Sequence, residues 1–295
     1  MSASVQAFAD GAVQARGLAQ MLEVPIHIVE VHRFPDSELL PTVSEPSDTI
    51  IVYRSLDRPN EKLVELMLAA EAWRRLGAQR LVLVAPYLPY MRQDQAFAPG
   101  QAISQRAVGK LLSACFDRVV TVAAHLHRTH DIASAFPRIE AQNLSPAAAL
   151  ATYIGWRAND PVIVGPDAEA SPLAGAVAER LSAPWFSLSK IRSGDRNVEV
   201  SMPPDAAVEG RCVVLVDDIC SSGATLVRAV ELLKRAGAAE VCVTVVHALF
   251  DADAERRLSE AGVCWIASTD SVPHPTNAIT LAATLADALR QEVEA

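Results

Sequence analysis

Cysteine, positive charge and long apolar runs are scarce in this sequence, and each scarcity excludes a class of protein. Only 5 of the 295 residues are cysteines, with no Cys-x-x-Cys pair among them, which excludes a disulfide-rich secreted domain. Lys and Arg number 26 against 35 Asp and Glu, so the net charge of −9 argues against a general nucleic-acid binder. No apolar run approaches the roughly 18–20 residues of a membrane span, and no secretory signal is recognisable. We therefore expect a cytoplasmic protein with no membrane and no nucleic-acid partner.

The five cysteines are expected to be reduced thiols. Cys212, Cys242 and Cys264 lie in or beside apolar runs, which favours places in the core. The spacing of the cysteines matches no zinc-ligand set.

What the sequence has in quantity is apolar residues in strand-like and helix-like patterns. Hydrophobic residues make up 51% and charged residues 21%, which is typical of a globular chain with a sizeable core. At roughly 100–200 residues per domain, the length favours two domains.

A β-α-β pattern occurs twice. In the first half, strands at 49–53 and 81–85 flank a helix at 63–78. In the second half, strands at 212–216 and 241–246 flank a helix at 226–238. Further strands are expected at 119–122 and 162–164.

Continuous apolar strands that alternate with helices predict parallel sheets covered on both faces. We therefore expect an α/β fold of two similar domains, each a mainly parallel sheet flanked by helices. The helix-ending glycines Gly77 and Gly237 lie 160 positions apart, which suggests a duplication. The boundary is expected between residues 143 and 161, so that the domains are 1–145 and 146–295.

The most informative segment is VVLVDDICSSGATL, residues 213–226. An apolar strand ends in Asp217 and Asp218, and small residues then lead into a helix. Small residues allow backbone N–H groups and a helix N-terminus to surround a phosphate, while the two carboxylates suit sugar hydroxyls or a metal ion. The pattern therefore predicts a sugar-phosphate site, although an ordinary capped loop between strand and helix has the same residue types. The Walker and dinucleotide-binding patterns are absent.

This segment resembles the phosphoribosyl diphosphate (PRPP) loop of type I phosphoribosyltransferase folds. Four other segments resemble the ribose-phosphate pyrophosphokinases, in that family's order and over nearly the whole chain. They are Phe34-Pro35-Asp36-Ser37-Glu38, Arg92-Gln93-Asp94, Gly165-Pro166-Asp167 and Lys190-Ile191-Arg192. The resemblance also implies tandem phosphoribosyltransferase-like domains.

The resemblance implies an enzyme that transfers diphosphate from ATP to ribose 5-phosphate with Mg²⁺, giving PRPP and AMP. It assigns Lys190 and Arg192 to catalysis, Asp167 to the diphosphate loop, and His125 with Asp167 to magnesium. The implied ATP site comprises Phe34, Asp36, Glu38, Arg92, Gln93, Asp94 and His125. The implied ribose 5-phosphate site comprises Asp217, Asp218, Ser221, Ser222, Gly223, Ala224 and Thr225. A homo-oligomer, dimer or hexamer, is implied because the family's ATP site is shared between subunits.

Each of these residues also has an ordinary structural interpretation. Phe34 could fill the core, Arg92 could form a surface salt bridge, and His125 could cap a helix or pack in the core. Lys190 and Arg192 lie in a polar stretch that also suits a solvated hairpin.

Several positions depart from the family pattern. Ser37 stands for a glycine, Ala123 for an Asp two residues before the His, and Ile191 for an Arg. Ala168-Glu169-Ala170 stands where a glycine pair is common, and Ser221 and Ala224 replace an acid and a glycine. The departures at 123 and 168–170 keep open the alternative of a non-catalytic regulatory or adaptor protein. A phosphoribosyltransferase is a less favoured alternative, because the PRPP loop taken alone fits it as well.

Overall fold

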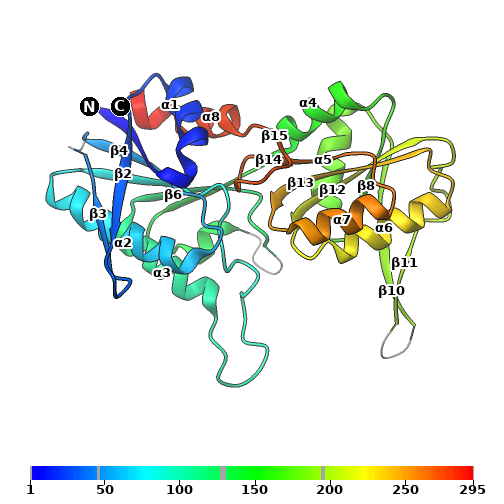
Figure 1. Ribbon diagram of the computed structural model, residues 1–295, viewed down its shortest axis with the longest axis horizontal. Helices are drawn as coiled ribbons and strands as arrows, with labels where there is room; N and C mark the ends of the chain where they lie inside the picture. The colour runs from blue at the N-terminus through cyan, green and yellow to red at the C-terminus, as the bar shows by residue number, and fades with distance from the viewer. Residues whose placement is uncertain (1, 45–46, 127–130, 194–196, 295) are drawn as a thin grey trace. The chain divides into compact units, whose positions relative to one another are not determined.

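The computed structural model describes residues 2–44, 47–126, 131–193 and 197–294, with side chains described outside 190–200. The chain forms two compact units (Figure 1). The first comprises Met1–Leu144, Ser271–Pro273 and Leu281–Ala295, and the second comprises Ser145–Asp270 and His274–Thr280.

The first unit contains a seven-stranded sheet in the order β3-β2-β1-β4-β5-β6-β7. All neighbouring strands are parallel except β2 and β3, which form an antiparallel hairpin. The strands are β1 (Ala3–Phe8), β2 (Ile26–Arg33), β3 (Leu39–Thr42), β4 (Thr49–Tyr53), β5 (Arg80–Val84), β6 (Arg118–Val122) and β7 (Glu140–Leu144). The helices are η1 (Ala9–Gly11), α1 (Ala12–Leu22), α2 (Pro59–Arg75), α3 (Ser104–Cys115), η2 (Ile132–Ala135) and α8 (Ala282–Glu294).

The second unit contains a six-stranded parallel sheet in the order β15-β14-β13-β12-β8-β9, together with an antiparallel β10-β11 pair. Its strands are β8 (Val162–Gly165), β9 (Trp185–Ser187), β10 (Ser189–Ser193), β11 (Asn197–Ser201), β12 (Cys212–Cys220), β13 (Glu240–Ala248), β14 (Ile266–Thr269) and β15 (Asn277–Ile279). Its helices are α4 (Ala147–Arg157), α5 (Ser171–Leu181), α6 (Ala224–Arg235) and α7 (Ala252–Glu260).

The two sheets share one strand order. When β3 and the β10-β11 pair are set aside, the order β2-β1-β4-β5-β6-β7 matches β9-β8-β12-β13-β14-β15 strand by strand. The antiparallel additions also occur at the same point of the chain, between the second and third strands of each sheet. The α/β fold of two mainly parallel sheets flanked by helices is therefore confirmed.

The closing helices are exchanged between the units. Helix α4 follows the last strand of the first sheet but packs on α5 of the second unit, and α8 follows the last strand of the second sheet but packs on α1 of the first. The compact units thus differ from the expected division, which assigned all of 146–295 to the second domain. Two ion pairs hold α8 to the first unit, because Glu292 binds Arg80 at 2.6 Å and Arg118 at 2.8 Å.

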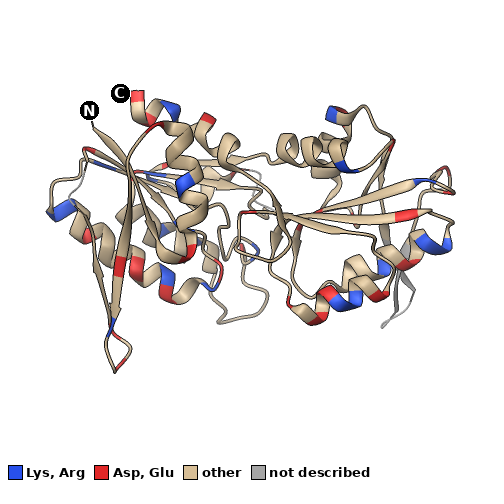
Figure 2. Ribbon diagram, turned by 45° about the horizontal axis from the view of Figure 1, so that its top comes forward, with Lys and Arg blue, Asp and Glu red and all other residues tan. Residues whose placement is uncertain are grey.

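Each sheet is apolar on both faces because helices cover both. The core of the first unit includes the fully buried Trp73, Leu66 and Phe136, and that of the second includes Leu215, Val243 and Leu233. Most charged residues lie on helices and near strand ends (Figure 2). Continuous apolar strands therefore predicted the parallel sheets correctly.

Two elements differ from the sequence prediction. Strand β12 continues to Cys220 instead of ending at Val216, because β13 continues to Ala248 and the two remain paired. Helix α2 begins at Pro59 instead of Leu63, since proline fits the first turn of a helix. Residues 189–193 and 197–201 pair as the antiparallel strands β10 and β11, which agrees with the hairpin interpretation of this polar stretch.

Among the described residues, no helix has the length and apolar character needed to cross a membrane. All five cysteines are free thiols. Cys242 is buried as expected, but Cys212 is half-buried and Cys264 is exposed.

Candidate functional site

The acidic end of β12 brings two carboxylates together at the carboxyl edge of the second sheet. The backbone N–H of Asp218 donates to Oδ1 of Asp217 at 2.9 Å. Burial raises the pKa of Asp217 well above its usual range, and the negative charges of Asp218 and Asp167 raise it further. The carboxylates at this strand end therefore repel one another.

The loop after β8 adds the third carboxylate. Strand β8 lies beside β12, with Val164 opposite Leu215, so the residues that follow both strands emerge at the same edge. Oδ1 of Asp167 accepts from the backbone N–H groups of Glu169 and Ala170 at 3.1 and 3.3 Å. This local turn fixes the Asp167 carboxylate near Asp217, while the Glu169 side chain is exposed.

A tight approach shapes the start of this loop. A Cβ on Gly165 would lie 2.6 Å from the Ser187 hydroxyl and 3.3 Å from the Asp167 carbonyl oxygen. A larger residue at 165 would require the Ser187 hydroxyl to move and would crowd the Asp167 backbone.

The small-residue segment after β12 leads into helix α6. Gly223 has a φ of 71°, in the left-handed region that glycine adopts without strain, and it precedes the first helical residue. Ser221, Ser222 and Ala224 are exposed, so the Ala224 methyl group that replaces a family glycine points into no packed core. The first N–H groups of a helix need acceptors, and a phosphate at this end would supply them.

Arg257 is a cation beside this segment that the sequence prediction missed. Its guanidinium donates to the carbonyl oxygen of Ser222 at 2.9 Å and pairs with Asp253 at 2.7 Å. It lies 35 positions from Ser222, on α7, so no local sequence pattern joins the two residues.

In the first unit, residues 34–38 form the tip of the β2-β3 hairpin. The backbone N–H of Phe34 donates to the Glu38 carbonyl at 2.9 Å, and that of Glu38 donates to the Asp36 carboxylate at 3.2 Å. The Phe34 side chain is 39% exposed and meets His32 edge-on at 4.6 Å, so it does not fill the core. An exposed aromatic ring beside two exposed carboxylates suits a purine base and its amino group.

Ser37 occupies a backbone conformation that explains the family's glycine. Its φ is 75°, in the left-handed region where a Cβ is strained. The hairpin therefore keeps its shape although Ser37 is in a strained backbone conformation.

The first turn of α2 connects the hairpin with the loop after β5. Glu61 pairs at 2.7 Å with Arg33, the last residue of β2 before the hairpin tip. The neighbouring Asn60 accepts from the Tyr90 hydroxyl at 2.6 Å. The hairpin tip and the Arg92-Gln93-Asp94 segment are thus attached to the same helix end.

The Arg92-Gln93-Asp94 segment is itself tied to α3. The Gln93 side chain accepts from the Ser104 hydroxyl at 2.6 Å, and its carbonyl accepts from the Gln105 N–H at 3.2 Å. The Arg92 side chain is exposed, as a phosphate-binding fork requires.

His125 follows β6 at the carboxyl edge of the first sheet and is half-buried. The preceding turn is fixed by Ala123 and Ala124, whose N–H groups donate to the Leu144 carbonyl at 3.0 Å and to Oδ1 of Asn143 at 2.8 Å. Ala123 has a φ of 42°, and Asp and Asn tolerate that region better than alanine does. The family's Asp therefore suits the backbone at this position.

Lys190 and Arg192 lie on β10, where their backbones pair with Val200 and Val198. Their side chains lie outside the described residues, so their predicted catalytic role stays a prediction. His125 belongs to the first unit and Asp167 to the second. A magnesium site shared by these two residues is likewise untested.

The residues at the end of β12 fit a magnesium ion. Mg²⁺ takes oxygen ligands, and Asp167, Asp217 and Asp218 supply carboxylates whose mutual repulsion already raises the pKa of Asp217. A divalent cation at this edge would relieve that repulsion.

Comparison with known proteins agrees with this arrangement. The family model of the N-terminal domain of ribose phosphate pyrophosphokinase matches residues 5–115, and that of the phosphoribosyl transferase domain matches 141–281. The ribose-phosphate pyrophosphokinase of Methanopyrus kandleri is 36% identical over 97% of this chain and 98% of its own length. That of Thermococcus kodakarensis is 37% identical over 86% of this chain and 89% of its own.

A solved structure extends the likeness to three dimensions. Phosphoribosylpyrophosphate synthetase from Mycobacterium smegmatis superimposes with a TM-score of 0.84 at 25% identity, covering 100% of this chain and 99% of that one. The likeness therefore covers the residues of both units. The chain belongs to the ribose-phosphate pyrophosphokinase family, as its motifs predicted.

Proposed function

We propose that this chain transfers the β,γ-diphosphoryl group of ATP to the C1 hydroxyl of ribose 5-phosphate, giving PRPP and AMP. The observation that carries the proposal is the acidic strand end followed by a small-residue helix start, in a chain whose relatives over nearly its full length are ribose-phosphate pyrophosphokinases. The C1 oxygen attacks the β-phosphorus and loses its proton, and the bond from that phosphorus to the oxygen retained by AMP breaks.

Ribose 5-phosphate is proposed to bind at the end of β12. Asp217 and Asp218 accept from the ribose hydroxyls. Ser221–Thr225 surround the 5-phosphate with backbone N–H groups and hydroxyls, and the N-terminus of α6 favours its negative charge. Arg257 holds this segment through the Ser222 carbonyl and adds positive charge beside it.

ATP is proposed to bind through the first unit's segments. Phe34 stacks on the adenine ring, and Asp36 and Glu38 accept from its amino group. Arg92 binds phosphate oxygens through its planar guanidinium, while Gln93, Asp94 and His125 complete the site. Because the family pattern shares this site between subunits, a homo-oligomer remains part of the prediction, as does a cytoplasmic location.

Mg²⁺ is proposed to bind at Asp167, Asp217 and Asp218, with His125 near the nucleotide. When bound, it neutralises phosphate charge and orients the diphosphoryl group. Lys190 and Arg192 are proposed to stabilise the charge that develops on the transferring group, since phosphoryl transfer depends chiefly on positioning and electrostatic stabilisation.

The test is an assay of AMP and PRPP formation from ATP, ribose 5-phosphate and Mg²⁺. We expect equal amounts of the two products. Absence of AMP under conditions where the protein binds PRPP would reject the transfer reaction and support the non-catalytic alternative, which Ala123 and Glu169 motivate. Formation of a nucleotide from PRPP and a free base, without AMP release, would support the phosphoribosyltransferase alternative.

A further inference from the structure

A group of thiol and carboxylate ligands lies at the edge of the second sheet opposite the proposed sugar-phosphate site. Cys212 begins β12, Glu240 begins β13, and Cys242 follows two residues later. Cys212 is paired directly with Glu240, and Cys242 is paired with Val214. One ligand atom from each of the three side chains lies within 4.8 Å of the other two.

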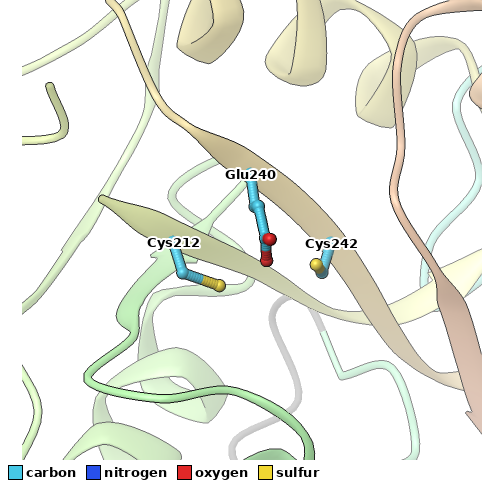
Figure 3. A group of neighbouring side chains, drawn as sticks. All are labelled: Cys212, Glu240 and Cys242. Atoms are coloured by element: carbon cyan, nitrogen blue, oxygen red, sulfur yellow. The ribbon is translucent and has the colours of Figure 1, made fainter. Parts of the chain in front are cut away.

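The three side chains point toward one another. Figure 3 shows the sulfur atoms of Cys212 and Cys242 on either side of the Glu240 carboxylate. The negative charge of Glu240 acts on both thiols, which agrees with their closeness. The three side chains therefore lie close enough together to bind one ion.

Burial differs across the group in a way that suits an ion entering from solvent. Cys242 is 0% exposed, Cys212 is half-buried and Glu240 is exposed. Burial raises the pKa of both thiols, and the nearby charge of Glu240 raises it further. Both thiols thus keep their protons at neutral pH and are poor nucleophiles, which disfavours a catalytic role.

A soft cation is the ligand whose chemistry these groups match. Two thiolates and a carboxylate are zinc ligands, and tetrahedral zinc has sulfur at about 2.3 Å and oxygen at about 2.0–2.2 Å. The three ligand atoms lie within 4.8 Å of one another, so small side-chain movements would give that geometry. Hard cations such as Mg²⁺ select sites of oxygen ligands alone.

We propose that Cys212, Cys242 and Glu240 form a binding site for a zinc-like divalent cation, with water as the fourth ligand. Binding displaces two thiol protons, and two sulfur–metal bonds and one oxygen–metal bond form without oxidation or reduction. The site joins the first residues of β12 and β13. It is separate from the sugar-phosphate site, because Cys212 and Asp217 are five residues apart on an extended strand, roughly 16 Å.

The test uses the reduced full-length protein, with zinc chloride or cadmium chloride as the only added soft metal and excess Mg²⁺ to occupy oxygen-only sites. We expect one metal ion per chain, release of about two protons per ion, and a thiolate-to-cadmium charge-transfer band. Cys212→Ser and Cys242→Ser are expected to abolish the band. Glu240→Gln is expected to keep the band and to weaken affinity by at least about tenfold.

A matched control tests the assignment. Cys115→Ser removes a half-buried thiol of the first unit, so this variant is expected to bind cadmium as the unmodified chain does. An unchanged band in Cys212→Ser, or loss of the band in Cys115→Ser, would overturn the proposed ligand set.

A second measurement needs no variant and stands even if a serine substitution prevents folding. Zinc is expected to protect Cys212 from alkylation, as read by peptide mass spectrometry, and to leave the alkylation rate of the half-buried Cys115 unchanged. Equal alkylation of Cys212 with and without zinc would overturn the proposal whether or not the chain makes PRPP.

Discussion

The two sheets carry opposite charges at equivalent positions. Thr49 pairs with Arg80 where β4 and β5 begin, and Cys212 pairs with Glu240 where β12 and β13 begin. Five residues further along each strand path stand Arg54 in the first unit and Asp217 in the second. Equivalent strand positions thus carry a cation in the first unit and a carboxylate in the second.

The surroundings of these residues differ as much as their charge. Arg54 forms ion pairs with Asp10 and Glu65, and its guanidinium lies 4.2 Å from the centroid of the Phe8 ring. Lys62 joins the same group through Asp10 at 2.9 Å. The first unit therefore pairs the cation at its strand end with carboxylates, whereas the second unit brings together carboxylates that repel one another.

The starting edges differ as well. Where the second unit has Cys212, Glu240 and Cys242, the equivalent residues of the first are Thr49, Arg80 and Val82. Arg80 pairs with Glu292 of α8 at 2.6 Å, so this edge is used to attach a helix. Duplication of a fold therefore conserves strand order, while each edge acquires its own chemistry.

The largest expected effect comes from removing the cation of the first unit. Arg54→Met would leave the nearly buried Glu65 without its partner, and breaking such a pair costs about 3–5 kcal/mol. We expect that loss in the unfolding free energy of the first unit, measured by hydrogen exchange of the β4 and β5 amides. Arg33→Met, which breaks an exposed pair with Glu61, is the control and should cost no more than about 1 kcal/mol. Equal losses in the two variants would contradict a structural role for the Arg54 group.

The next effect is on catalysis in the second unit. Asp217→Asn keeps the shape of the side chain but removes its negative charge, and we expect PRPP formation to fall by on the order of a hundredfold. The control is Asp160→Asn, which changes an exposed carboxylate paired with Arg211. A variant Asp217→Asn with normal turnover would exclude this residue from the site.

The same substitution is expected to stabilise the second unit. Because the pKa of Asp217 is raised in the folded state, the folded protein binds a proton more tightly than the unfolded chain, and stability falls as pH rises through that folded pKa. Asn carries no such penalty. The Tm of Asp217→Asn should therefore be higher than that of the unmodified protein at neutral pH. This difference in Tm should shrink as the pH is lowered. A constant difference across pH would contradict the raised pKa.

The smallest effect concerns the β2-β3 hairpin. Its second strand belongs to the first sheet, whereas β10 and β11 form a sheet of their own in the second unit. Ser37→Gly removes a Cβ from a left-handed residue and should stabilise the hairpin by about 1 kcal/mol. Ser37→Ala retains the Cβ and is expected to show no such gain. Hydrogen exchange of the Phe34 amide, which bonds to Glu38, measures both.

Sequence patterns predicted the parts of the molecule that depend on local residues. The apolar runs at 49–53 and 212–216 predicted parallel strands because both faces of each sheet are covered by helices. The Asp217-Asp218 pair and its small-residue loop were recognisable because their chemistry is contiguous in the chain. The predicted end of β12 was wrong because its last four residues are held by pairing with β13.

Features built from distant residues could not be predicted in this way. Arg257 meets Ser222 from another helix, and α8 returns to the first unit through Glu292. The Cys212–Cys242 group escapes any motif because its ligands lie on neighbouring strands 30 positions apart. The positive φ of Ser37 and Ala123 could not be predicted either, because serine and alanine rarely adopt that conformation.

The most direct test of the divergence between the two strand ends is calorimetric titration of ribose 5-phosphate into the unmodified chain, Asp218→Asn and Arg54→Lys. Our account predicts that Asp218→Asn weakens or abolishes binding, whereas Arg54→Lys, which retains the charge of the first unit, leaves the dissociation constant unchanged. Undiminished binding by Asp218→Asn together with loss of binding in folded Arg54→Lys would place the sugar phosphate in the first unit and contradict the account.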